Sequence, residues 1–191
     1  MCNNSAKSAG FTLVELIITI AIAGILVTIA IPSFNSTISS NRLTNSANDF
    51  VGALNLARSE AVKRGIQVTV RNNGAATHWE RGWNVFVDVN GDENYNPPDT
   101  LCRTNANGSP IEDCLLRTYT SLSTGYTLTT GNSTYQNYAA YFPTGLSTVV
   151  VGDTFRLCYG ADLTTSLIIV INAAGRARIS PAAAGNNPVC P

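Results

Sequence analysis

One apolar stretch near the N-terminus limits what this chain can fold into. The 21 residues from Phe11 to Ile31 are apolar or small except for three threonines and Glu15. As an α-helix that rises about 1.5 Å per residue, this stretch is about 32 Å long. The length fits a membrane-spanning helix, because the hydrocarbon core of a bilayer is about 30 Å thick. A secretory signal peptide would have a shorter apolar region followed by its cleavage site, whereas here the plausible processing point, Gly10, precedes the apolar stretch.

Glu15 is the one ionisable side chain in this stretch. A charged group within a membrane span costs at least about 2.5 kcal/mol and usually has a partner. Cleavage after Gly10 would make Phe11 the new N-terminus and would put its amine one helical turn from Glu15. The amine of one subunit could then neutralise the carboxylate of a neighbour as the helices pack together. The alternative is an ordinary membrane anchor in which the glutamate has no such role.

The rest of the chain is long enough for one soluble domain. Without a ten-residue leader and the apolar span, about 150 of the 191 residues remain, and a domain of this size can bury a hydrophobic core. The formal net charge is zero, and loss of Lys7 with the leader would leave one net negative charge. Nucleic-acid binding would therefore need a local basic patch.

A second helical pattern follows the span. Apolar residues recur every three or four positions from Leu43 to Ala61, which predicts an amphipathic helix that ends near Arg64 and has one buried stripe. Pro32 predicts a kink, and Gly65 predicts the C-cap. The stripe consists of Leu43, Ala47, Phe50, Leu54, Ala57 and Ala61. We therefore expect a leader at residues 1–10, a membrane or filament-core half of the helix at 11–32, and an amphipathic half at 33–65.

From Ile66 onward the pattern changes to the two-residue alternation of β-strands. It runs through Ile66–Val70 and Trp83–Val89, each of which predicts a half-buried strand, with a turn at Asn72–Thr77 between them. Further strands are predicted at Leu115–Thr120, Tyr126–Thr130, Tyr138–Phe142, Thr154–Tyr159, Leu167–Asn172 and Arg176–Ile179, followed by a C-terminal loop from Ser180. The predicted fold class is α+β, in which a long N-terminal helix packs on a mainly antiparallel sheet formed by residues 66–191.

Four of the five cysteines lie after the span, whereas Cys2 would be removed with the leader. An even number of cysteines in a domain that faces the periplasm or the exterior predicts two disulfides. Three pairings are possible, and neighbours in sequence are the easiest to close, which favours Cys102 with Cys114 and Cys158 with Cys190. A zinc site is the alternative, but there is no CxxC spacing and only one histidine, His78.

Side chains with oxygen atoms alternate along DVNGDENYNPPD, residues 88–99. Their spacing is that of an EF-hand loop, in which alternating oxygens surround Ca²⁺. The segment differs where it matters, because Glu93 takes the place of the turn glycine and an aspartate replaces the last, bidentate glutamate. The pattern favours a polar hairpin loop, with calcium as the alternative and no other cofactor indicated. The candidate ligands are Asp88, Asn90, Asp92 and Asn94.

Arg176 and Arg178 form a second candidate site. Side chains two positions apart in a strand face the same way, so both guanidinium groups would project from one face and could contact successive phosphates. Residues 154–191 also contain Arg156 and only one acidic residue, Asp162, which predicts a positive tip on a neutral chain. Residues that could extend this surface are Lys63, Arg64 and Arg71.

No motif indicates an enzyme. The sequence lacks a GxSxG nucleophile elbow and a GxxxxGK[ST] phosphate loop, and no nucleophile pairs with His78. The acidic pairs Asp92/Glu93 and Glu112/Asp113 lie in polar loops, where we do not expect a raised carboxylate pKa.

The N-terminus resembles a type IV prepilin leader and cleavage site. This resemblance rests on Met1 to Gly10 followed by FTLVEL. The segments RGWNVFVDVNGDENYN, YFPTGLST, TFRLCYG and INAAGRARIS resemble, in order, the globular part of the FimT, FimU and GspH group of minor pilins and pseudopilins. The resemblance implies cleavage after Gly10 by prepilin peptidase and N-methylation of Phe11. It also implies storage in the inner membrane with a periplasmic C-terminal domain, and assembly with other pilins driven by Phe11 and Glu15.

In FimT-type proteins the GRxR tail is implicated in binding DNA for uptake during natural transformation. For this chain the resemblance implies phosphate contacts by Arg176 and Arg178, with Gly175 as the turn that presents them. The expected function is therefore a minor type IV pilin, in a pilus or at its tip, that binds DNA without sequence preference. The alternatives are a priming minor pilin without a ligand, a GspH-like pseudopilin of a type II secretion system, and an adhesin.

Overall fold

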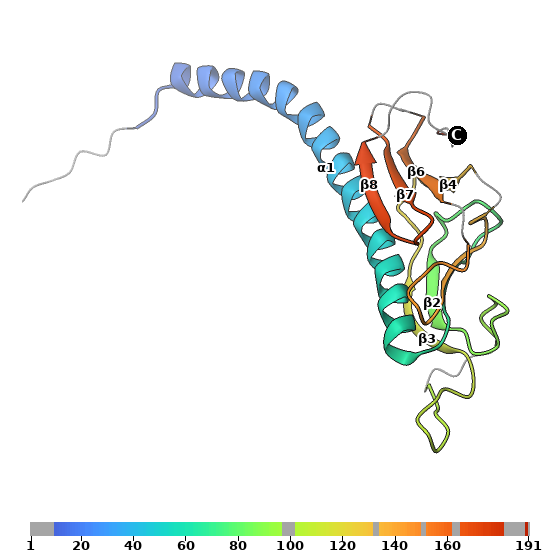
Figure 1. The fold of residues 1–191 in the computed structure, drawn as a ribbon. Helices are drawn as coiled ribbons and strands as arrows, with labels where there is room; N and C mark the ends of the chain where they lie inside the picture. Colours follow the sequence, from blue (N-terminus) through green and yellow to red (C-terminus); the bar gives the residue numbers. More distant parts are fainter. Residues whose placement is uncertain are drawn as a thin grey trace, which may run out of the picture. The chain divides into compact units, whose positions relative to one another are not determined.

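The computed structural model describes residues 10–96, 102–131, 134–149, 152–161, 165–181 and 190. The chain divides into two compact units, residues 1–39 and 40–191. Helix α1 (Leu13–Arg64) is one element of 52 residues that continues through position 32 (Figure 1). The predicted leader before Gly10 lies outside the described residues. The prediction that the C-terminal loop begins at Ser180 was wrong, because Ser180 and Pro181 pair with Ile168 and Leu167 as the end of a strand. The remainder of that predicted loop, residues 182–189 and 191, lies outside the described residues.

The first half of α1 buries none of its large apolar side chains. Each described one from Phe11 to Ile31 is more than half exposed to solvent. By length and composition, α1 is the one described helix that could cross a membrane. Since exposed aliphatic surface is unfavourable in water by about 25 cal/mol per Å², this half of the helix needs lipid or protein against it.

The second half of α1 has the buried stripe that the sequence predicts. Leu43, Ala47, Phe50, Leu54, Ala57 and Ala61 are all at most 3% exposed. The helix ends where Gly65 takes a left-handed φ of 66°, and the Gly65 amide donates to the carbonyl of Ala61 at 3.0 Å. The prediction of a glycine C-cap is confirmed.

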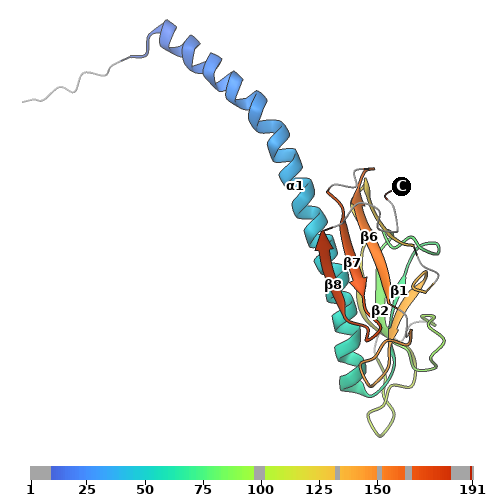
Figure 2. The same cartoon turned by 45° about the horizontal axis from the view of Figure 1, so that its top comes forward.

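Two antiparallel four-stranded sheets form the core together with this stripe, so the predicted fold class is confirmed. Their orders are β3-β2-β1-β5 and β4-β6-β7-β8. Figure 2 shows β6, β7 and β8 of the second sheet side by side. The strands are β1 (Val68–Asn72), β2 (Trp83–Val87), β3 (Cys114–Tyr119), β4 (Tyr126–Thr130), β5 (Tyr138–Tyr141), β6 (Asp153–Tyr159), β7 (Leu167–Ile171) and β8 (Ala177–Pro181). Each overlaps a strand that the sequence predicts.

Phe50 joins the helix to both sheets. Its ring centroid lies 5.1 Å from that of Trp83 in β2 and 4.9 Å from that of Phe155 in β6. Trp79 completes this cluster, 5.2 Å from Phe50 and 5.5 Å from Phe155. Its backbone amide also donates to Leu128 of β4 at 2.8 Å. One aromatic side chain of α1 thus packs against both sheets.

The prediction that the first two strands are half-buried was wrong. In β1, Val68, Thr69 and Val70 are all buried, and in β2 so are Val85, Phe86 and Val87. The cause is the segment after β2, which folds back so that Tyr95 packs against Phe86 with ring centroids 5.2 Å apart. Residues that alternation assigns to solvent are therefore covered by a loop of the same chain.

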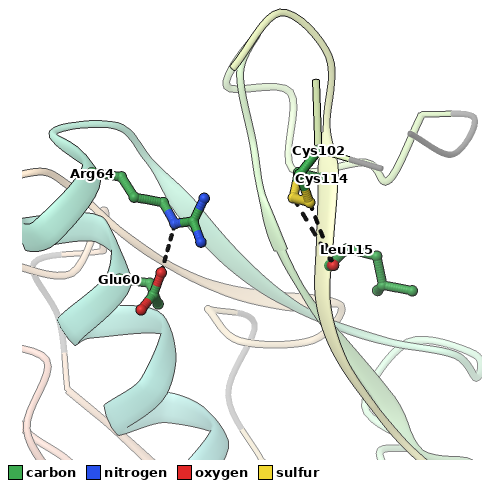
Figure 3. Close-up of a disulfide and its surroundings, with 5 residues drawn as sticks. All are labelled: Glu60, Arg64, Cys102, Cys114 and Leu115. Carbon is green, nitrogen blue, oxygen red and sulfur yellow. Dashed lines mark hydrogen bonds and ion pairs between the residues drawn. A yellow bond between two sulfur atoms is a disulfide. The ribbon is translucent and has the colours of Figure 1, made fainter. Parts of the chain in front are cut away.

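Two disulfides cross-link the domain. Cys102 pairs with Cys114 at the start of β3, as Figure 3 shows in close-up, and Cys158 of β6 pairs with Cys190. The Cα atoms are 4.8 Å and 5.8 Å apart, respectively. These are the two pairings that proximity in sequence favours.

Candidate functional site

Thr12 begins the apolar helix and places Glu15 in its first turn. The Thr12 hydroxyl accepts a hydrogen bond from the Glu15 amide at 3.2 Å, and the Thr12 carbonyl accepts one from the Leu16 amide, also at 3.2 Å. This is the geometry of an N-cap residue. Glu15 is exposed, and no ion pair joins it to another described residue of the chain. Its carboxylate is therefore accessible in the first turn of the helix.

Arg176 and Arg178 lie together at the turn between β7 and β8. Arg176 precedes β8, so the prediction that it belongs to the strand was wrong, whereas Arg178 pairs with Val170 of β7. Both side chains are exposed. They line one hollow of about 490 Å³ together with Val170, Asn172 and Ala177. The two guanidinium groups are thus available on one side of the hairpin.

Each of the other predicted basic residues has a partner within the chain. Arg156 is only 1% exposed and donates to Ser166 Oγ at 3.1 Å, so its inclusion in a positive tip was wrong. Asp162, the acidic residue of the same segment, lies outside the described residues. Lys63 and Arg64 both form ion pairs with Glu60. Arg71 donates to the Glu93 carbonyl at 2.7 Å. The candidate phosphate-binding groups are therefore Arg176 and Arg178.

Asp88 organises the polar loop that follows β2. Its carboxylate is buried and accepts hydrogen bonds from the backbone amides of Gly91 (2.7 Å) and Glu93 (3.0 Å). It also accepts from Gln67 Nε2 (3.0 Å) and Thr69 Oγ1 (2.9 Å). Four donors on one buried carboxylate fix the path of the loop, since each would be left unsatisfied without it.

Asp113 joins this loop from the start of β3. It accepts the backbone amides of Val89 at 2.9 Å and Asn96 at 3.1 Å, and its carboxylate lies within 4.8 Å of those of Asp88 and Asp92. Burial raises the pKa of Asp113, and the charges of Asp88 and Asp92 raise it further, although the two amides oppose this. Burial also raises the pKa of Glu93. The expectation of no raised carboxylate pKa in these loops was therefore wrong.

The predicted calcium ligands are only partly brought together. Asp88 and Asp92 converge with Asp113, and three carboxylates suit a hard cation. Asn90 instead accepts the Asp92 amide at 3.2 Å, and Asn94 Nδ2 donates to the Asp92 carbonyl at 2.8 Å. The two asparagines thus stabilise the loop itself. Calcium binding stays the alternative to a polar hairpin loop, and Asp99, the last position of the EF-hand pattern, lies outside the described residues.

We expect Asp88→Asn to lower the free energy of unfolding by about 2 kcal/mol, because an amide has one acceptor oxygen and turns an NH₂ group toward buried donors. Chemical denaturation measures the loss, with Asp92→Asn on the exposed side of the loop as the control. Equal losses in the two variants would contradict a special role for Asp88. Millimolar Ca²⁺ that raises the melting temperature of the native chain, but not of Asp88→Asn, would instead identify a calcium site.

Two contacts of these sites were not predicted from the sequence. Asp113 accepts the Val89 amide from 24 positions along the chain, and Tyr141 of β5 donates its hydroxyl to the Gly175 carbonyl at 2.9 Å. Neither contact has a spacing signature. The apolar run Tyr138–Phe142 predicts a strand, but it does not show what Tyr141 contacts.

Comparison with known proteins gives two family matches. Residues 46–175 match the model described as Type II transport protein GspH, which covers more than half of the chain. Residues 5–31 match the prokaryotic N-terminal methylation motif. No curated protein sequence is significantly similar to the chain.

Three solved structures resemble the fold. Two are crystal forms of the type IV minor pilin FimU from Pseudomonas aeruginosa, with TM-scores of 0.52 and 0.54 and 19% sequence identity each. They cover 73% and 78% of this chain and 93% and 96% of the FimU chains. The third is the minor pseudopilin EpsH from the type 2 secretion system of Vibrio cholerae, with a TM-score of 0.47, 17% identity, and coverage of 73% and 97%. At this identity the likeness to FimU shows the fold alone.

Proposed function

The chain belongs to the GspH family of type IV pilin-like minor pilins and pseudopilins, and we propose that it is a minor type IV pilin, in a pilus or at its tip. The observation that carries this proposal is the first half of α1. Its apolar side chains are exposed throughout, and the exposed carboxylate of Glu15 stands in its first turn. A surface of this kind is stable only against lipid or against the same segment of other subunits.

The proposal gives each part of the chain a location. Prepilin peptidase removes residues 1–10, and Phe11 becomes the methylated N-terminus. Residues 11–32 hold the subunit in the inner membrane and then in the filament core. Residues 33–65 form the amphipathic half of the helix, which packs on the β-domain. Residues 66–191 face the periplasm and later the cell surface. The role is structural, so we propose no catalytic activity.

Recovery of the chain in sheared pili tests this function. We expect the full-length mature chain to copurify with the major subunit of the pilus. The main alternative is a pseudopilin of a type II secretion system, in which case deletion of the gene would block protein secretion and leave the pili unchanged. Neighbouring genes for pilus assembly and competence, rather than for secretion, would support the minor pilin over the pseudopilin.

Arg176 and Arg178 support a second role, capture of DNA without sequence preference. Both are exposed at one turn and line a common hollow. Two guanidinium groups at one turn suit contacts with neighbouring phosphates, which give affinity but carry no sequence information.

We expect Arg176→Ala combined with Arg178→Ala to weaken DNA binding equally for unrelated sequences. The slope of log affinity against log salt should fall by about two at most, because each lost phosphate contact removes about one released counterion. A gel-shift titration of the mature full chain in detergent at several salt concentrations measures both effects. The control replaces two other exposed arginines, Arg81 and Arg103, by alanine. Unchanged affinity in the Arg176/Arg178 variant would reject DNA capture through this turn.

A further inference from the structure

A side chain of the opposite sheet is hydrogen-bonded to the turn that carries the two arginines. Tyr141 lies in β5 of the first sheet, whereas Gly175 lies between β7 and β8 of the second. The Tyr141 hydroxyl donates to the Gly175 carbonyl at 2.9 Å, and Tyr141 is only 1% exposed. Burial also raises the pKa of Tyr141, so the hydroxyl stays protonated and keeps donating.

Gly175 is held against Tyr141 without spare room. A Cβ atom at this position would lie 2.8 Å from Tyr141 Cε1 and 3.0 Å from the Ser147 amide nitrogen. The φ of 75° at Gly175 is also one that other residues rarely adopt. Glycine is therefore required both by the backbone conformation and by the close approach of the tyrosine ring.

The rest of the turn is closed by its own hydrogen bonds. The Gly175 amide donates to the Asn172 carbonyl at 2.8 Å, and the Asn172 amide donates to the Arg176 carbonyl at 3.0 Å. The Asn172 side chain accepts the Arg176 amide at 2.9 Å. These bonds set the shape of the turn, but each joins residues within the hairpin. The Tyr141 hydroxyl, in contrast, bonds the turn to the other sheet.

We propose that Tyr141 is a positioning residue for the arginine turn, which it holds in the conformation that presents Arg176 and Arg178 to phosphates. This inference rests on the proposed DNA binding. A turn that is already ordered loses less conformational freedom on binding, and the saving appears directly as affinity. Tyr141 itself is buried and does not touch the ligand.

Tyr141→Phe tests the proposal, because phenylalanine keeps the ring in the core and removes only the hydroxyl. We expect the mature full chain in detergent to bind mixed-sequence duplex DNA about fivefold more weakly, in line with the loss of one hydrogen bond of about 1 kcal/mol. Hydrogen exchange measured by mass spectrometry should be faster in peptides that cover residues 172–176. The matched control is Thr130→Val, which removes another buried hydroxyl, bonded to Asp153 at 2.7 Å, and should leave DNA affinity and exchange at 172–176 unchanged.

The outcomes separate this inference from the function on which it rests. If Arg176→Ala with Arg178→Ala weakens binding and Tyr141→Phe does not, the positioning role is overturned and DNA capture stands. If the arginine variant binds DNA normally, DNA capture itself fails. Unchanged exchange at residues 172–176 in Tyr141→Phe overturns the positioning role whatever the DNA result. Added to the arginine double variant, Tyr141→Phe should cause no further loss of affinity.

Discussion

Glu15→Ala is expected to reduce the amount of this chain in sheared filaments by at least tenfold. In the membrane, an unpaired carboxylate costs at least about 2.5 kcal/mol, and pairing with a neighbouring Phe11 amine in the filament removes that penalty. A difference of this size corresponds to more than a tenfold shift in the equilibrium between membrane and filament. Alanine has no charge to bury, so the variant pays no such cost in the membrane. Its transfer from the membrane to the filament therefore lacks this favourable free energy. Immunoblots of the sheared filament fraction and of the membrane fraction measure the ratio.

Thr19→Ala is the matched control for this variant. Thr19 is also a polar residue of the apolar helix, but its hydroxyl donates to the Leu16 carbonyl of the same helix at 2.8 Å. It therefore needs no partner from another subunit, and its loss should leave filament levels unchanged. Wild-type incorporation of Glu15→Ala, at equal membrane levels, would show that the exposed carboxylate has no role in assembly.

Removal of the Cys158–Cys190 disulfide is expected to lower the free energy of unfolding by about 3.7 kcal/mol, the value that chain entropy gives for a loop of this length. The two cysteines are 32 positions apart, and the loop that they close contains both β7 and β8. Without the bond, we expect faster hydrogen exchange in the β7–β8 hairpin. Denaturation of the Cys158→Ala, Cys190→Ala variant measures the loss.

The second disulfide provides the comparison. Cys102 and Cys114 are only 12 positions apart, for which the same relation gives about 2.8 kcal/mol. Their removal should loosen the loop before β3 and leave exchange in the β7–β8 hairpin unchanged. If both pairs of alanines affected that hairpin equally, the C-terminal disulfide would have no specific role in holding the arginine turn.

The sequence was sufficient to predict the helix and the strands, because the patterns that indicate them are local. The stripe from Leu43 to Ala61 follows the helical period, and Gly65 stops the helix for a reason that lies in its own backbone. The strands are also local segments, and each predicted strand overlaps an observed one. Proximity in sequence favoured the two disulfides that the structure contains.

The errors arose where a distant segment decides the environment of a residue. Alternation assigns Phe86 to solvent, but Tyr95 covers it. A count of charges puts Arg156 on the surface, whereas its strand is central in the second sheet and the side chain is buried. The raised pKa of Asp113 likewise depends on burial first, and then on carboxylates from another part of the chain. None of these contacts has a signature in the local sequence.

The central claim is that a subunit cut after Gly10 enters a filament through its new N-terminus and Glu15. Mass spectrometry of the N-terminal peptide, from chains recovered in sheared filaments, tests this most directly. We predict a peptide that begins with N-methylated Phe11. A peptide that still carries residues 1–10 would contradict the claim, because no free amine would then exist to meet the carboxylate.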